Sequence, residues 1–351
     1  MGDPAPTGGA RPARYGADER AGLARRAEPV EGVERLPDAE RIERVLVAER
    51  PRLVGLAYRI TGSRLDAEDV VQEAWERARR SDARAVDRPA AWLTTVVARL
   101  ALDHLKAAQR RRETYVGPWL PEPVATGQGD PGSAGSVPPG DAGAASDPAE
   151  LTELAESLTF GFLRLLEALS PVERVVFVLA DVFGAPFPEI AAAVDRSPAA
   201  CRQIASRARA RVRDDGRRHQ APDDAPKVAD DLVSALVLGD TDRVLALLAP
   251  DVVLVSDGGA GRRAARRPVV GPHRVGRLAT HLVRRGLDIA PGAALSVEWR
   301  ELNGEPAALT SVDGEVVFAA VFAVDGGRVR RIWSLLNPDK LAALRLAGPI
   351  E

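Results

Sequence analysis

Residues 187–213 read FPEIAAAVDRSPAACRQIASRARARVR, and they indicate the fold of the middle of the chain most clearly. A short apolar helix is predicted over 187–194, followed by a tight turn at 195–196 and a second helix that begins at Ser197-Pro198. Two helices joined in this way form a helix-turn-helix, whose second helix enters the major groove of DNA. The alternative is a helical hairpin with a solvated basic face.

The second helix of this motif carries the candidate base-reading residues. Arginine reads guanine, and glutamine reads adenine, through paired hydrogen bonds in the major groove. We therefore expect this helix to bind DNA, with its outer arginines on phosphates, through Arg202, Gln203, Ser206, Arg207 and Arg209. Cys201, the only cysteine, is expected to be a small packed thiol.

Sequence upstream of this motif predicts a helical domain and a linker. Ser170-Pro171 followed by Glu173 is a capping box with proline at the first helical position, so the domain is expected over 149–216. Residues 115–148 are predicted to be a linker. Within it, 124–148 contain no lysine, arginine or aromatic residue, which is typical of a flexible tether.

A second all-α domain is expected over 37–114, after an N-terminal arm (1–36) whose lack of apolar periodicity predicts disorder. One helix, near 65–80, has an acidic and polar face made of Asp69, Gln72, Glu73 and Glu76. That face is either simply solvated or a docking surface.

The next helix, 90–112, has an apolar stripe on one side. Along its other side it is expected to expose Thr95, Arg99, Asp103, Lys106 and Arg110, and Trp92 stands at its start. Such a polar stripe can follow phosphates, and an aromatic side chain at the helix start can either stack on an unpaired base or belong to the core.

The C-terminal third, 223–351, predicts an α+β domain with a curved antiparallel sheet. Two amphipathic helices (227–238 and 241–248) precede a set of strands. Asn303-Gly304, Asp313-Gly314 and Asp325-Gly326-Gly327 separate runs near 294–302, 306–312, 315–324 and 328–336, which is the pattern of an antiparallel meander. Leu295, Val297 and Trp299 alternate with polar residues, so one face of their strand is expected to be buried.

Composition limits the possible functions of the chain. With 351 residues it is expected to form two or three domains. Its net charge is −2, but residues 196–218 hold eight arginines against two aspartates, so any nucleic-acid binding must be local. One cysteine and four scattered histidines predict neither disulfides nor a metal site, and no cofactor is expected. No apolar run could span a membrane, so a soluble, cytoplasmic protein is expected.

These residues resemble a known family. DAEDVVQE (66–73), with Trp92-Leu93 and Asp103-His104-Leu105, resembles region 2 of sigma-70-type transcription initiation factors. Leu169-Ser170-Pro171, continuing through Arg202-Gln203, resembles region 4. The resemblance implies that the acidic face binds the RNA polymerase core, that the 90–112 stripe recognises the −10 promoter element, and that the helix-turn-helix recognises the −35 element. Region 3 is absent, as in the extracytoplasmic-function subfamily.

Three further motifs resemble a subgroup of that subfamily with a fused SnoaL-like C-terminal domain. They are YVGPWLPEP (115–123), Asp257-Gly258-Gly259 and NPDKL (337–341). The resemblance implies an interdomain regulatory contact formed by Trp119, Leu120, Pro121, Asp257, Gly258, Gly259, Asn337, Pro338, Asp339 and Lys340. The glycine motif usually continues with another glycine and a lysine, whereas here Ala260 and Gly261 follow.

Two other functions stay open at this point. One is a helix-turn-helix regulator that acts without the polymerase. The other is a C-terminal domain that binds an unknown small ligand or acts as an enzyme. Its cone-shaped cavity would be lined by Asp257, Trp299, Arg300, Asp313 and Trp333. No acid/base pair with a positioned histidine is visible, so the chain is not expected to be an enzyme.

Overall fold

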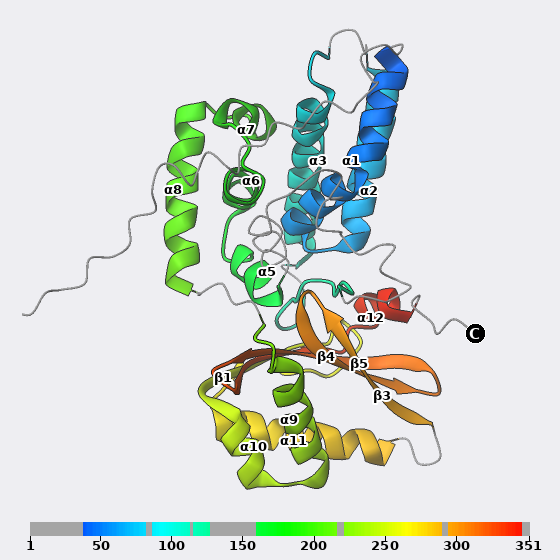
Figure 1. The fold of residues 1–351 in the computed structure, drawn as a ribbon, viewed down its shortest axis with the longest axis vertical. Coiled ribbons are helices and arrows are strands. Elements are labelled where there is room, and N and C mark those ends of the chain that lie inside the picture. Colours follow the sequence, from blue (N-terminus) through cyan, green and yellow to red (C-terminus); the bar gives the residue numbers. More distant parts are fainter. Residues whose placement is uncertain are drawn as a thin grey trace, which may run out of the picture.

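A helical part and an α+β part, shown in the upper and lower halves of Figure 1, make up the protein. The computed structural model describes residues 38–81, 86–112, 115–126, 159–215, 221–289 and 294–345. The predicted N-terminal arm and most of the predicted tether lie outside these ranges.

Three long helices form the first section of the helical part, as predicted. Ser63 accepts a hydrogen bond from the Asp66 backbone N and so begins the second helix. Leu53, Val70 and Leu93, one from each helix, are buried against one another. The helices are α1 (Asp38–Thr61), α2 (Arg64–Arg80) and α3 (Pro89–Arg112).

The second section contains the predicted helix-turn-helix. The capping box at Ser170 is confirmed, since Ser170 and Glu173 satisfy each other's backbone N–H groups. Asp195 adopts a left-handed conformation, φ 54°, which makes the tight turn of the motif. The elements are α5 (Phe160–Leu166), α6 (Pro171–Phe177), the π-helical turn η5 (Val178–Val182), α7 (Phe187–Val194) and α8 (Pro198–Asp215).

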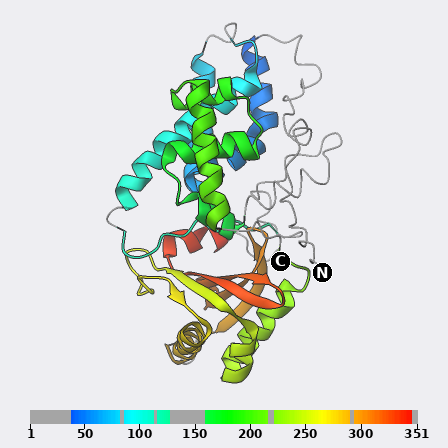
Figure 2. The same cartoon turned by 90° about the vertical axis from the view of Figure 1, so that its left-hand side faces the viewer.

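The two helical sections share one hydrophobic core. Helix α3 packs on α6 and α7, and Val96 and Phe187 lie against the common core. Figure 2 shows the same close arrangement from the side. The sequence predicted two helical domains but not this packing between them, because contacts between the sections use the same apolar residue types as contacts within either one.

The C-terminal domain is a mixed sheet covered by helices, so the α+β prediction is confirmed. Its helices and strands are α9 (Ala225–Leu238), α10 (Thr241–Leu247), β1 (Leu248–Asp257), β2 (Val269–Val270), α11 (Pro272–Ile289), β3 (Leu295–Leu302), β4 (Glu305–Val312), β5 (Glu315–Asp325), β6 (Arg328–Leu335) and α12 (Pro338–Arg345). The strand order is β2-β1-β6-β5-β4-β3.

The predicted meander β3–β6 is confirmed, but the sheet is not wholly antiparallel. Strand β1 pairs in parallel with β6, with Asp257 opposite Leu335. No hairpin turn joins these strands, because the chain between them includes α11 and strands β3 to β5, so local turn chemistry could not reveal the pairing.

Both faces of the sheet are buried. Helices α9 to α11 cover one face, where Leu254, Phe322 and Ile332 lie. The other face, with Val321 and Trp333, is covered by α12, by Leu120 of the linker and by Phe160 of α5. Part of this cover therefore comes from outside the domain.

Strand β3 departs from the expected burial pattern. Leu295 and Val297 are 39% and 50% exposed, although Trp299 packs on Phe322 with ring centroids 6.0 Å apart. Because β3 is an edge strand, it has a neighbouring strand on one side only.

Candidate nucleic-acid interface and interdomain site

Helix α8 has a buried face of small residues and an exposed polar face. Cys201, Ala205 and Ala208 are buried, whereas the four predicted readers Arg202, Gln203, Ser206 and Arg207 are exposed. Arg209 differs from them, because it is half-buried and its Nε donates to Asp181 Oδ1 at 2.6 Å. This contact ties α8 to η5, so Arg209 already has a structural partner.

Helix α3 is partly covered in its N-terminal half. Trp92 and Thr95 are half-buried, and the Thr95 hydroxyl donates to the Ala91 carbonyl. Arg88, just before α3, pairs with Glu189 of α7 at 3.0 Å. The remaining predicted residues, Arg99, Asp103, Lys106 and Arg110, are exposed.

The acidic face of α2 is accessible. Asp69, Gln72 and Glu76 are exposed and Glu73 is half-buried. Glu73 pairs with Arg77 at 2.8 Å, and Glu76 with Arg80 at 3.2 Å, one turn along the same helix. Exposed pairs of this kind contribute only about 0.3–0.5 kcal/mol, so a binding partner can displace them at little cost.

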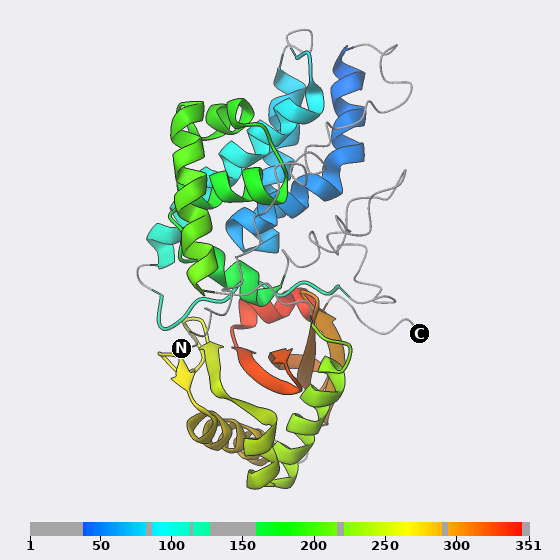
Figure 3. The same cartoon turned by 60° about the vertical axis from the view of Figure 1, so that its left-hand side comes forward.

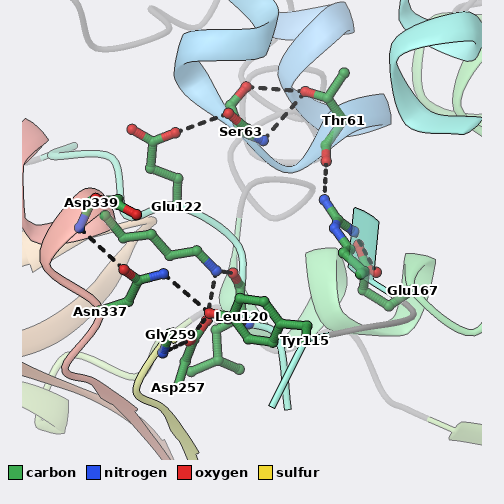
Figure 4. Close-up of polar contacts among 12 residues, drawn as sticks. Thr61, Ser63, Tyr115, Leu120, Glu122, Glu167, Asp257, Gly259, Asn337 and Asp339 are labelled. Carbon is green, nitrogen blue, oxygen red and sulfur yellow. Dashed lines mark hydrogen bonds and ion pairs between the residues drawn. The ribbon is translucent and has the colours of Figure 1, made fainter. Parts of the chain in front are cut away.

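The buried carboxylate of Asp257 is the centre of the interdomain site (Figure 4). Its Oδ2 accepts hydrogen bonds from Leu120 N at 2.8 Å and from Lys340 Nζ at 2.6 Å. Its Oδ1 accepts from Gly259 N at 3.1 Å and from the Tyr115 hydroxyl. One side chain at the end of β1 thus connects the linker to α12.

Lys340 is enclosed by the linker. Its ammonium also donates to the Leu120 carbonyl and lies 4.0 Å from the centre of the Trp119 ring, while Arg112 stacks on that ring at 3.3 Å. Burial lowers the pKa of Lys340 to about 8, against the opposing effect of Asp257. The ion pair with Asp257 is therefore the main interaction that favours the charged form of Lys340.

The other motif residues complete this site. Asn337 Nδ2 donates to the Tyr115 hydroxyl at 3.1 Å, and Asn337 Oδ1 accepts from Asp339 N. Gly259 has φ +61°, and a Cβ there would lie 2.8 Å from Asn337. Pro121 and Gly258 are buried, whereas Pro338 and Asp339 are exposed at the start of α12. The structure thus brings together all three motifs.

Linker residues also contact the first helical section. Glu122 Oε2 accepts from Ser63 Oγ at 3.1 Å and from Arg64 N at 2.8 Å, at the N-terminus of α2, where a carboxylate is favoured. The Tyr58 hydroxyl donates to the Glu122 carbonyl and accepts from Asn303 Nδ2 at 2.8 Å. Tyr58, the linker and the β3–β4 turn therefore form one buried network.

A cluster of charges joins the two helical sections. Glu167 pairs with Arg174 at 2.8 Å and with Arg112 at 3.0 Å, and Arg174 also donates to the Ile60 carbonyl. Burial alone would raise the pKa of Glu167, but the two arginines keep it below its ordinary value.

Glu305 forms a further contact between the C-terminal domain and the helical part. Its buried carboxylate accepts a hydrogen bond from Phe160 N at 3.1 Å, at the start of α5. Burial raises the pKa of Glu305 to about 8. Sequence reasoning missed Tyr58, Glu122, Glu167, Arg174, Asn303 and Glu305. The sequence indicates Asn303 only as a turn residue. Glu122 could have been found from its position within the YVGPWLPEP motif.

The Glu305→Gln variant should show the cost of burying this carboxylate. A raised folded-state pKa means that the folded state binds the proton more tightly, so wild-type stability falls as pH rises from about 4.5 to about 8. We expect the variant to become increasingly more stable than the wild type over this range. The difference in the free energy of unfolding should reach about 2–4 kcal/mol at pH 8 and above. Urea unfolding at several pH values measures this, with the exposed Glu301→Gln as control. Parallel pH profiles for wild type and Glu305→Gln would contradict the prediction.

The residues suggested for a ligand cavity do not converge. Trp299 lies on the face of the sheet covered by α9 to α11 and Trp333 on the face covered by α12, because Trp299 is in register with Ser334 and successive positions of a strand alternate between faces. Asp257 is in the interdomain site, and Asp313 is exposed in a turn.

Among the described residues, no cluster of three or more His, Cys, Asp or Glu side chains could bind a metal. Every helix in the described ranges is too short or too polar to cross a bilayer.

Comparisons with known proteins define the class. Residues 46–111 match the family model of sigma-70 region 2, and residues 160–212 match that of sigma-70 region 4. The helical part is therefore that of a sigma-70-type factor, with α2 and α3 in region 2 and the helix-turn-helix in region 4.

Full-length relatives narrow this class. The chain is 41% identical over 299 residues to the ECF RNA polymerase sigma factor SigJ of Mycobacterium tuberculosis, covering 84% of this chain and 91% of that protein. It is 33% identical over 302 residues to the probable ECF sigma factor SigI of the same species, covering 85% and 94%. The crystal structure of SigJ superimposes with a TM-score of 0.64 at 36% identity, covering 86% and 98%. The chain belongs to the extracytoplasmic-function sigma factors and is an alternative sigma factor that directs transcription.

Proposed function

We propose that this sigma factor binds the polymerase core through the acidic face of α2, contacts the −10 element through α3 and reads the −35 element through α8, and that its C-terminal domain regulates it by stabilising a closed arrangement of regions 2 and 4. It acts in the cytoplasm, on the transcription machinery. The main support is that regions 2 and 4 share one core while the reading face of α8 is already exposed.

The closed arrangement is too compact for simultaneous binding of both promoter elements. The names of the two elements place them about 25 base pairs apart, or about 85 Å at about 3.4 Å per base pair. In the structure α3 packs directly on α6 and α7. Regions 2 and 4 must therefore separate when promoter DNA is bound.

The C-terminal domain supports the closed arrangement through contacts on both sides. It contacts region 2 through Asn303 and Tyr58, and region 4 through Glu305 and Phe160. The interface between regions 2 and 4, which must open, contains the ion pair of Arg88 with Glu189 and the charge cluster around Glu167. We assign regulation to these protein contacts, since the polar groups suggested for catalysis do not meet.

Two experiments test the proposal. Run-off transcription with core polymerase and genomic DNA fragments should give defined start sites only when this chain is present. Dyes placed at Val47→Cys and Ala192→Cys, both exposed and in different regions, should show high energy transfer in the free chain and low transfer in the promoter complex. Cys201 is buried and stays unlabelled. The absence of start sites would refute the function, and unchanged transfer would refute the opening.

Base reading by α8 gives a separate prediction. Arg202→Ala and Gln203→Ala should each weaken binding of the −35 element by about 5- to 150-fold, because one bidentate base contact contributes about 1–3 kcal/mol. Competition binding with sites altered one base at a time measures the loss, and the altered protein should discriminate less at one position only. Arg328→Ala, in the C-terminal domain, is the control. Equal loss on every DNA sequence would show phosphate contacts instead.

A further inference from the structure

A strongly basic loop lies in the C-terminal domain next to the interdomain site. Residues 258–287 contain eight arginines and no aspartate or glutamate, in a chain whose net charge is −2. Four of these, Arg262, Arg263, Arg266 and Arg267, are exposed between β1 and β2. No carboxylate in the described part of the chain lies within ion-pair distance of these four. We call residues 262–267 the arginine loop.

The position of the arginine loop is constrained at both ends. On one side, Gly259 N donates to Asp257, and Arg262 N donates to the Gly258 carbonyl at 3.1 Å. A Cβ at Gly258 would lie 2.4 Å from the Arg262 carbonyl oxygen, so the turn is tight. On the other side, β2 pairs with β1. A loop ordered in advance loses less entropy when it binds a ligand.

The arginine loop lies against the linker segment that follows α3. A Cβ at Gly117, five residues after α3 ends, would lie 3.5 Å from Arg266 Cα. Figures 2 and 3 show the blue-green linker running between the C-terminal end of α3 and the yellow part of the C-terminal domain. Helix α3 itself has the exposed cations Arg99, Lys106 and Arg110, and Arg110 is seven residues before Gly117.

We propose that the arginine loop binds the phosphate backbone of promoter DNA beside the segment contacted by α3, so that the C-terminal domain is itself part of the DNA-binding surface. The guanidinium group pairs with phosphate oxygens in a bidentate manner, and unpaired cations in a row fit the regular spacing of a nucleic-acid backbone. Arg274 and Arg277, in the first turns of α11, are also exposed. This proposal rests on the proposed function, because it requires α3 to lie on DNA.

Salt dependence of promoter binding is the first test. The variant R262Q/R263Q/R266Q/R267Q, in holoenzyme, should bind promoter DNA at least about 40-fold more weakly near 0.15 M salt, as a slope change of about 2 implies. The slope of log K against log salt should fall in magnitude by about 2–4, at roughly 0.9 for each phosphate that the variant no longer neutralises. The pairs R262Q/R263Q and R266Q/R267Q should each show part of this effect.

A matched control removes cations from the far side of the same domain. R243Q/R284Q/R328Q alters α10, the C-terminal half of α11 and the start of β6. Arg328 is at the opposite end of β6 from Leu335, the residue that pairs with Asp257. We expect wild-type affinity and slope. If the loop variant also shows wild-type values while wild-type holoenzyme starts transcription normally, the arginine loop does not bind DNA although the proposed function stands.

A cleavage experiment locates the loop on the DNA. Gly261 has open space around it, so Gly261→Cys can bear an iron-chelate reagent that cuts nearby DNA. Cuts beside the −10 element are expected, with none from the exposed Ser296→Cys on β3. If Gly261→Cys produces no cuts in a complex that still starts RNA, the inference is overturned. If no start site forms at all, the failure is that of the proposed function.

Discussion

Replacing Asp257 by alanine should lower the free energy of unfolding by about 3–5 kcal/mol, one of the two largest effects expected in this protein. The substitution leaves the buried Lys340 ammonium without its carboxylate partner, and an uncompensated buried charge is strongly destabilising. It also removes the acceptor for Leu120 N and for Gly259 N. Urea unfolding gives the total change.

Hydrogen exchange shows where the effect occurs. The Leu120 amide, which donates to Asp257, should exchange faster in Asp257→Ala, whereas amides buried within region 2 should keep their protection. The exposed Asp339→Asn is the control and should change stability by less than about 1 kcal/mol. A loss below about 1 kcal/mol in Asp257→Ala would show that the interdomain site contributes little.

A second substitution separates the charge from the packing. In an Asp257→Asn background, Lys340→Met should recover part of the lost stability, because removing both partners of a buried pair leaves no unpaired charge. The double-mutant cycle then gives the coupling energy of the pair. Additive losses would mean that Asp257 and Lys340 act independently.

The triple reversal D69K/E73K/E76K should weaken binding of the polymerase core by at least about 100-fold. Juxtaposed like charges cost several kcal/mol at an interface, and these carboxylates are exposed or half-buried on one face of α2. Fluorescence anisotropy with labelled sigma factor and purified core measures the affinity. Binding should also weaken with added salt in the wild type.

Two variants make this result interpretable. The neutral D69N/E73Q/E76Q should give an intermediate loss without creating repulsion against Arg77 and Arg80, the present partners of Glu73 and Glu76. The control D223K/D230K/D242K also reverses three carboxylates, all of them exposed aspartates of the C-terminal domain. It should bind the core normally. Unchanged core affinity in the α2 reversal would favour a regulator that works without the polymerase.

Local features were predictable from sequence because neighbouring residues encode them. The helix-turn-helix was predicted from a proline-led capping pattern and a turn, and α7 and α8 begin where expected. The meander turns were predicted because Asn303 and Asp313, each followed by glycine, tolerate positive φ, and they have φ 53° and 50°. The residues of the interdomain site were named only through the resemblance to a family, not from their chemistry.

Local sequence was enough to predict the helices, the turns of the meander and the polar face of each candidate surface, since each depends on periodicity or turn chemistry within a few residues. Three features could be seen only in the folded chain: β1 lies parallel to β6, regions 2 and 4 share a core, and Tyr58 contacts Asn303, 245 positions away. The physical reason is that burial is non-directional, so an apolar or polar side chain shows that it needs a partner but not which distant segment supplies it.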